Sequence, residues 1–375
     1  MFDPYFCPAV LTRNVPKPHS LVLMPTIDSG KTRKQTNPSI PPLVLSATTR
    51  KNVLVVGSGG TFQGSSKKRT ATASYECGTH SIADLLKEVP ELSEIARIEF
   101  LGLMQVASPD LTPEDLIHIS QTIQKRLEGA VDACVFIGGS DLLALIGYFL
   151  ELTIQSHKGV VLLGAAIPPT SYGADGFKNL ICALNLAMST AGVYMVFDNK
   201  IYQPRYTVKQ DATSLCPFHS FAGHLGIFKD SKPRIFYRLP LEPVNRRYFD
   251  VKGLKTLPTV NILSYQLGMT DTLFYNTIEH ADGLVLEGVG GGNWTRHLGK
   301  KITEFAKKSK KIIVVASKAF AYTEAKDAYG IGPPCIGSGF LDASKSQLQL
   351  QLALASGYDY QATKELFEEN NYNAC

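Results

Sequence analysis

The sequence predicts an α/β protein with two domains, of which the N-terminal one is larger. Short runs of Val, Ile and Leu that end in glycine alternate with segments of helical periodicity. Apolar runs without polar alternation are typical of strands buried on both faces, and hence of mostly parallel sheets flanked by helices. The length of 375 residues allows two domains at roughly 150 residues each.

The N-terminal domain is expected to alternate strands with helices from residue 52 onward. Thr112 is a suitable N-cap residue, and the proline after it favours the first turn of a helix. The expected strands are 53–56, 97–104, 134–137, 160–163 and 193–197. The expected helices are 81–87, 112–127, 142–154 and one that follows Asp175.

A smaller α/β domain is expected after a segment that breaks this rhythm. Residues 229–258 are rich in proline and charge, which indicates an interdomain linker. The later strands are predicted at 260–264, 283–286 and 312–316, with helices starting near Thr270, Asn293 and Ser344. The predicted organisation is an irregular N-terminal extension at 1–50, a domain at 51–228, a linker at 229–258 and a domain at 259–375.

Composition and charge argue against several classes of protein. Residues 1–51 hold seven Lys or Arg and two Asp, which accounts for the whole net charge of +5. The remainder is near neutral and shows no basic groove interleaved with aromatics, so we expect no nucleic-acid partner. No apolar run approaches the ~20 residues that span a bilayer, so we expect no membrane insertion.

Cysteine usage favours a reducing compartment. The seven cysteines are scattered and form no CxxC pair, so neither a disulfide framework nor a metal site is expected. Residues 1–50 contain no basic region leading into an apolar core, as a secretory signal would. We therefore predict a cytoplasmic protein, with a transit peptide as the alternative interpretation of the acid-poor extension.

The stretch from Asn52 to Ser65 is the first candidate for a functional site. An apolar strand ends in glycines, whose missing side chains let the backbone turn sharply and approach a ligand. Thr61 is the first hydroxyl after the turn, at the carboxyl edge of the strand, where open α/β sheets bind small molecules. A nucleophile can be presented in this way. The alternatives are a plain turn and a helix cap.

An ordered set of motifs resembles the bacterial-type L-asparaginase family. The family usually shows TGGTI, HGTDT, a VGAMRP segment and SADG, in that order. Its counterparts here are Gly59-Gly60-Thr61, Gly138-Gly139-Ser140-Asp141, Gly164-Ala165 and the stretch from Pro168 to Gly176. Further matches lie at 249–251, 257–258 and 288–293. The resemblance covers roughly residues 52–360 and implies the two-domain asparaginase-like fold.

The resemblance implies an amidohydrolase that works through a threonine ester. In the family, the threonine is helped by a tyrosine on a mobile loop, and a second triad of Thr, Lys and Asp supports the reaction. Position by position, the implied catalytic residues are Thr61, Tyr75, Ser140 and Asp141. The implied substrate-binding residues are Gly60, Ser108, Gly139, Asp141 and Ala165, of which Asp141 would bind an amino group and Ala165 would contribute to an oxyanion hole.

Each of these side chains also has a purely structural interpretation. Tyr75 could be a surface aromatic on a polar loop. Ser108, which precedes a proline, could initiate a turn. Asp141 could cap the helix that begins at the next residue, and this would not prevent ligand binding.

The sequence departs from the family pattern at several positions. The supporting lysine is expected at the end of the helix after SADG, but residues 185–192 contain none. Lys178 is the nearest substitute, although a solvated helix face is its expected place. The family's glutamine after the binding serine is Pro109. The asparagine given to a neighbouring subunit's site falls near Leu267, and Glu324 is a possible match for the family's glutamate.

These observations lead to a prediction with two rivals. We expect an asparaginase-like amidohydrolase with a threonine nucleophile and an altered substrate range. The rivals are a repurposed enzyme acting on a bulkier amide or amine by elimination, cyclisation or isomerisation, and a non-catalytic small-molecule-binding descendant. No cofactor or metal is implied. The expected partners are a small-molecule substrate and further copies of the chain, in a dimer or tetramer.

Overall fold

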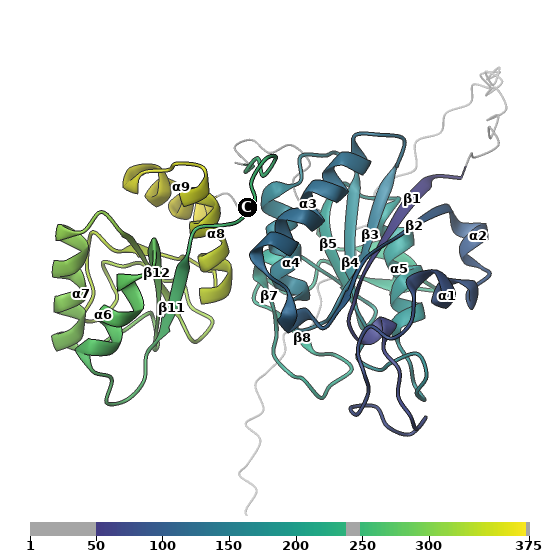
Figure 1. The fold of residues 1–375 in the computed structure, drawn as a ribbon, viewed down its shortest axis with the longest axis horizontal. Helices are drawn as coiled ribbons and strands as arrows, with labels where there is room; N and C mark the ends of the chain where they lie inside the picture. The colour runs from purple at the N-terminus through teal and green to yellow at the C-terminus, as the bar shows by residue number, and fades with distance from the viewer. Residues whose placement is uncertain (1–49, 238–247, 373–375) are drawn as a thin grey trace, which may run out of the picture. The chain divides into compact units, whose positions relative to one another are not determined.

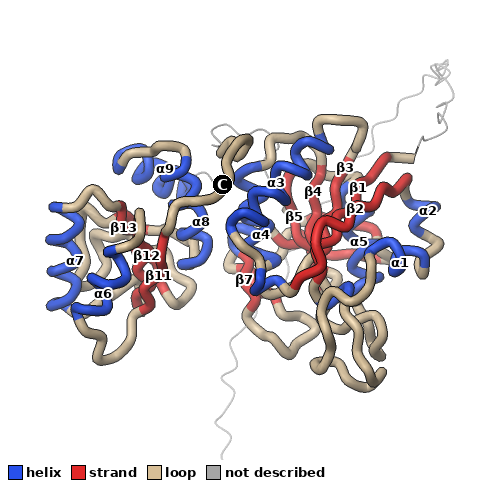
Figure 2. The backbone as a smooth tube through the Cα atoms, in the orientation of Figure 1, coloured by secondary structure: helices blue, strands red, loops and turns tan. Residues whose placement is uncertain are grey.

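The computed structural model describes residues 50–237 and 248–372, which form two α/β parts (Figure 1). Each part is a layered arrangement of one main sheet with helices packed against it (Figure 2). This is the two-domain α/β fold that the sequence predicts. The extension at 1–49 and the segment 238–247 lie outside the described residues.

The N-terminal part is built on an eight-stranded sheet in the order β10-β9-β6-β5-β4-β3-β1-β2. The strands from β2 to β5 are parallel to one another, whereas β6, β9 and β10 continue the sheet in antiparallel fashion. The strands are β1 (Asn52–Gly59), β2 (Arg97–Val106), β3 (Ala133–Ile137), β4 (Gly159–Leu163), β5 (Gly192–Phe197), β6 (Lys200–Tyr202), β9 (Gly226–Lys229) and β10 (Lys232–Ile235). A separate antiparallel pair consists of β7 (Thr207–Lys209) and β8 (Phe218–Ser220).

Helices cover both faces of this sheet because successive strand residues point to opposite sides. Leu54 and Val56 pack with α3 (Pro113–Leu127) and α4 (Leu143–Thr153). Val53 and Val55 pack on the other face, with α1 (Ile82–Lys87) and α5 (Gly176–Ala187). The short helix α2 (Leu92–Ile95) lies next to β2 in the chain, and its Leu92 joins the second core. The central strands are therefore apolar throughout, as expected from their sequence.

The C-terminal part contains a parallel four-stranded sheet in the order β11-β12-β13-β14. Its strands are β11 (Val260–Ser264), β12 (Gly283–Gly288), β13 (Ile312–Ser317) and β14 (Ile336–Gly337). Helices α6 (Asp271–Glu279) and α7 (Arg296–Lys308) pack on one face, and α8 (Ala343–Ala355) on the other. The last described helix is α9 (Tyr360–Tyr372).

The elements absent from the sequence-based prediction are mainly short strands and the last helix. The strands from β6 to β10 have three or four residues each, which is too short for a hydrophobic period to emerge. β10 lies within the predicted linker at 229–258, so the large sheet extends into that segment. The domain boundaries themselves stay predictions.

Candidate active site

Thr61 lies immediately beyond β1, after two glycines that the local packing requires. Gly59 and Gly60 have φ angles of +103° and +72°, a region that other residues avoid. A Cβ on Gly60 would lie 2.5 Å from the Cα of Gly139, which is the glycine turn after β3. The two turns are thus in direct backbone contact, and this contact brings Thr61 and Ser140 to the same edge of the sheet.

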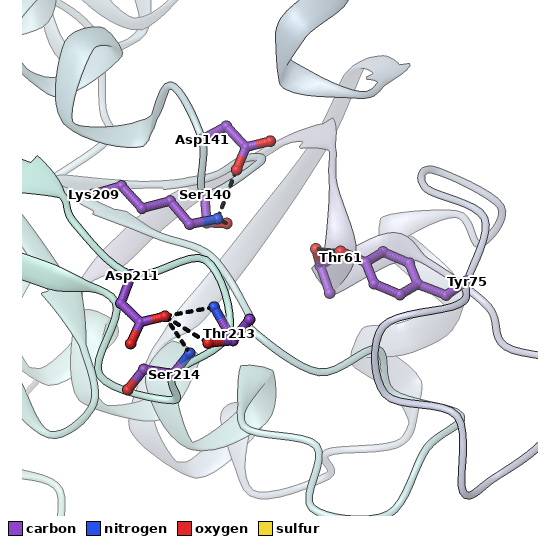
Figure 3. Close-up of polar contacts among 8 residues, drawn as sticks. All are labelled: Thr61, Tyr75, Ser140, Asp141, Lys209, Asp211, Thr213 and Ser214. Atoms are coloured by element: carbon purple, nitrogen blue, oxygen red, sulfur yellow. Dashed lines mark hydrogen bonds and ion pairs between the residues drawn. The ribbon is translucent and has the colours of Figure 1, made fainter.

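The side chain of Thr61 is buried and faces Tyr75. Its Oγ1 lies 2.6 Å from the Tyr75 hydroxyl, and either oxygen can be the donor (Figure 3). Thr61 opens a short 3-10 helix whose N-cap is Gly60, so its hydroxyl is not engaged in capping. The helix-cap interpretation of Thr61 is therefore wrong, and so is the interpretation of Tyr75 as a surface aromatic.

The loop that carries Tyr75 is held at both ends and along its length. Ser65 and Glu76 exchange two backbone hydrogen bonds of 2.9 Å, which close the loop at its base. At its far side, the backbone N–H of Tyr172 bonds to the Arg69 carbonyl at 2.8 Å, and the Arg69 guanidinium stacks on the Tyr172 ring. The position of the Tyr75 hydroxyl therefore depends on contacts well outside the site.

Burial raises the pKa of Tyr75 above its ordinary value, and the electrostatic influence of Cys77 and Asp141 raises that pKa further. The hydrogen bond with Thr61 opposes this shift without cancelling it. Tyr75 is therefore a neutral phenol near neutral pH, and it cannot simply remove a proton from Thr61. It can accept that proton only while it passes its own proton on.

Ser140 and Asp141 share one lysine, Lys209 (Figure 3). The Lys209 Nζ lies 2.9 Å from the Ser140 Oγ and 2.6 Å from the Asp141 Oδ1. A lysine therefore contacts Ser140, although residues 185–192 contain none. The lysine comes from β7, which follows β5 and β6 in the chain, and not from the helix that precedes β5.

Two features position Lys209: the pairing of β7 with β8, and a hydrogen bond to β7 from Lys345, a buried lysine of the C-terminal part. Lys209 pairs with Phe218 across the β7–β8 ladder. The side chain of Lys345, on α8, is buried and donates a 2.8 Å hydrogen bond to the carbonyl of Thr207, two residues before Lys209. In the turn between the two strands, Asp211 accepts hydrogen bonds from the residues at 213 and 214 (Figure 3).

The residues expected to bind substrate lie around the two glycine turns. A Cβ on Gly139 would lie 2.6 Å from the Oγ of Ser108, a buried serine at the end of β2. Ser108 also begins a short 3-10 helix, as its turn-forming interpretation expects, and its binding role stays a prediction. Ala165 is buried and follows Gly164, which closely approaches the carbonyl of Gly138. All of these positions lie at the carboxyl edge of the parallel strands.

The interpretation of Asp141 as a helix cap is wrong. The N-cap of α4 is Leu142, and no side chain caps this helix. Asp141 is exposed and bonds to Lys209. Its carboxylate can therefore meet a ligand while one of its oxygens stays paired.

The other residues considered for the site lie elsewhere or have other partners. Lys178 is exposed on α5, the place expected for a solvated lysine. Glu324 pairs with Lys326 at 2.7 Å. Leu267 is 95% exposed in the loop after β11. Lys209 is the site residue that the sequence analysis did not identify. Its only local signal is the polar–apolar–polar alternation of Thr207, Val208 and Lys209, a pattern that many loops share.

The described residues show neither a membrane-crossing helix nor a metal site. No helix among them is long and apolar enough to span a bilayer. In the same ranges, no cluster of His, Cys, Asp and Glu has the arrangement of a metal site. The five cysteines that the structure describes are all free.

Two family models cover most of the chain. Residues 52–241 match the model described as "Asparaginase, N-terminal", and residues 259–367 match the "Glutaminase/Asparaginase C-terminal domain". The chain belongs to the asparaginase family. Both halves of the family's architecture are therefore present, in the family's order.

Curated relatives and a solved structure agree with this membership. The chain is 31% identical over 323 residues to "Probable L-asparaginase 4" of Schizosaccharomyces pombe, covering 84% of this chain and 89% of that protein. It is 28% identical to "L-asparaginase 2" of Escherichia coli, covering 85% and 93%. A structure titled "Probable Cytoplasmic L-asparaginase" of Campylobacter jejuni matches with a TM-score of 0.78 and 28% identity, over 85% of this chain and 99% of that one. The compartment of the present protein stays a prediction.

Proposed function

We propose that this asparaginase-like amidohydrolase cleaves the side-chain amide of a small amino-acid-like substrate, with Thr61 as the nucleophile. The observation that carries the proposal is the meeting of two polar sets at adjoining glycine turns. One set is the Thr61–Tyr75 pair, and the other is Ser140, Asp141 and Lys209. A non-catalytic descendant would have no need to keep both.

The first chemical step is attack of the Thr61 Oγ1 on the amide carbon. The new C–O bond forms, the carbonyl oxygen becomes negative, and the C–N bond then breaks to release ammonia. Because the Tyr75 phenol is neutral, it takes up the Thr61 proton only as its own proton moves toward the leaving nitrogen. Water then attacks the ester, releases the acid and restores the threonine.

The glycine turns supply the electrostatic part of this proposal. Backbone N–H groups near Gly139 and Ala165 can donate to the negative oxygen, a contribution worth several kcal/mol in well-studied hydrolases. The Asp141 carboxylate offers an anchor for a substrate ammonium, and Ser108 offers a hydroxyl for a carboxylate. Lys209 bonds to both Ser140 and Asp141, so one cation orders both side chains.

We further propose an altered substrate range and assembly as a dimer or tetramer. Pro109 replaces an amide side chain next to Ser108, and the exposed Leu267 stands where the family places a polar residue for a neighbouring subunit. Both changes favour a less polar pocket than free asparagine needs. Light scattering of the purified protein measures the assembly directly.

Ammonia release tests the nucleophile. The substrates are L-asparagine, L-glutamine and their N-acylated or amide-extended derivatives, each assayed with the wild type, Thr61→Val and Thr61→Ser. Thr61→Val keeps the shape but lacks the hydroxyl, so no turnover is expected, whereas Thr61→Ser keeps partial activity. Thr256→Val, at an exposed threonine that is not among the proposed site residues, is the matched control. Undiminished turnover in Thr61→Val would remove the nucleophile assignment.

A further inference from the structure

A second cluster of reactive side chains lies in an open cleft of the N-terminal part. The cleft has a volume of about 810 Å³ and is lined by residues of β6, β8 and the loop between β7 and β8. Lys200, Tyr202 and Cys216 meet there, together with His219 and His224. None of the proposed catalytic side chains lines this cleft, so the cluster needs an explanation of its own.

The ammonium of Lys200 contacts the sulfur of Cys216 directly. The Lys200 Nζ lies 2.8 Å from the Cys216 Sγ, and the same ammonium bonds to Asp198 at 3.1 Å. The Tyr202 side chain lines the same cleft. The contact with Cys216 is the main reason why the pKa of Lys200 is raised. An ammonium in contact with a cysteine sulfur favours the reaction of that sulfur with electrophiles.

The other described cysteines provide a contrast. Cys134 and Cys182 are buried, and burial raises the pKa of both thiols. Cys77 is half-buried near the proposed active site, and burial followed by the charge of Asp141 raises its pKa as well. Such thiols stay protonated and react slowly. Cys216 is partly exposed and is the described cysteine that contacts an ammonium.

We propose that Cys216 is a peroxide-modification site whose oxidised form is captured by Lys200. The thiolate attacks one oxygen of hydrogen peroxide, the S–O bond forms, and the O–O bond breaks. The leaving hydroxide takes a proton from the Lys200 ammonium, which gives water, a sulfenic acid and a neutral amine. The amine then attacks the sulfur, water leaves, and an S–N bond joins the two side chains. Overall, one peroxide oxidises the thiol and amine pair and becomes two waters.

The cross-link would act on the hairpin that presents Lys209. The backbone N–H of Gln210 bonds to the carbonyl of Pro217 at 2.8 Å, and Lys209 pairs with Phe218. Tightening Cys216 against β6 therefore pulls on the strand that opposes Lys209. This effect on Lys209 rests on the proposed function. We expect oxidation of Cys216 to lower turnover about tenfold, because the Lys209 ammonium is displaced.

Peptide mapping of the full chain after treatment with stoichiometric hydrogen peroxide tests the modification. The expected product joins the peptides that contain Lys200 and Cys216, with a mass lower than their sum by two hydrogens, and dithiothreitol reverses it. Cys216 should be consumed about tenfold faster than Cys77, which serves as the reference within the same molecule. Equal rates for the two thiols would overturn the proposal without any variant having to fold.

Three variants separate the roles of charge and capture. Lys200→Met should slow the oxidation of Cys216 about tenfold, because the ammonium is lost. Lys200→Arg keeps the charge but does not capture, so a dimedone-reactive sulfenic acid should accumulate. Cys216→Ser should give no cross-link and keep full turnover under peroxide. A cross-link that forms without any loss of turnover would show that it does not act on Lys209. The change in turnover on peroxide treatment is a separate measurement from the ammonia release of the untreated protein.

Discussion

The ammonium of Lys209 donates a 2.9 Å hydrogen bond to the hydroxyl of Ser140, although the two residues are 69 positions apart in the chain. The contact exists because β7 runs past the glycine turn that follows β3. It joins a lysine, a hydroxyl and, through Asp141, a carboxylate in one polar set. This set makes the enzyme proposal stronger than the motifs alone could.

Replacing Lys209 should reduce catalysis sharply. Lys209→Met removes the cation that orders Ser140 and Asp141, so we expect kcat for ammonia release to fall by about 10²- to 10⁴-fold. Lys178→Met, which removes an exposed lysine of α5, is the matched control and should keep wild-type kcat. If the Lys209 variant retained full activity, the contacts of Lys209 with Ser140 and Asp141 would have no catalytic role.

The raised pKa of Tyr75 predicts the pH range in which the protein is active. Because burial raises the pKa of this phenol above its ordinary value of about 10, it keeps its proton across the neutral range. Turnover should therefore show no alkaline decline that depends on Tyr75 below about pH 10, and Tyr75→Phe should lower kcat by about 10²- to 10³-fold at every pH. An alkaline limb near pH 8 that disappears in Tyr75→Phe would contradict a neutral phenol.

The raised pKa of Tyr75 also makes the free energy of unfolding depend on pH. The unfolded chain releases the tyrosine proton at a lower pH than the folded chain does, so the folded state loses relative stability as the pH rises above about 10. Below that pH, both states hold the proton and the shift has no effect. Urea unfolding of the wild type and Tyr75→Phe on both sides of this value measures the difference.

The contact between the glycine turns should not tolerate a side chain. Gly60→Ala adds a methyl group that meets the backbone of Gly139, on top of the cost of its positive φ. Gly223→Ala has a similar φ of +79° but open space around the new methyl group, so it isolates the conformational cost. We expect Gly60→Ala to destabilise the fold by about 1–3 kcal/mol more than Gly223→Ala in denaturant unfolding. Equal losses would mean that the turns are not in contact.

Lys345 should affect both stability and catalysis from outside the site. Lys345→Met keeps the buried stem but removes the hydrogen bond to Thr207 and leaves Asp342 without its cation. Because Asp342 is partly exposed, we expect Lys345→Met to lower the free energy of unfolding by about 2–3 kcal/mol, less than the loss of one partner of a fully buried pair would. Displacement of β7 should also lower kcat about tenfold.

An exposed ion pair provides the comparison for Lys345. Lys87 pairs with Asp84 on the surface of α1, and Lys87→Met should cost less than about 1 kcal/mol with no effect on kcat. Stability and kcat are measured on the same preparations. A Lys345 variant that behaved like the Lys87 variant would show that the pair does not position Lys209.

Much of the candidate site could be predicted from the chain because its residues follow buried parallel strands. Val53 to Val56 form an apolar run, and the glycines after it lie in a region of φ that few other residues adopt, so the place of Thr61 was expected. The same argument located Ser140 and Asp141 after β3. In such strands the local sequence carries the structural information, because burial on both faces demands apolar side chains.

The sequence by itself therefore determined the α/β alternation, the glycine turns and the hydroxyls that follow them. Only the tertiary structure decided which lysine contacts Ser140 and which side chain contacts the sulfur of Cys216. β7 has only three residues, and it pairs with β8 and accepts a hydrogen bond from the buried Lys345. Its position is set by contacts between distant parts of the chain, and such contacts leave no local periodicity to read.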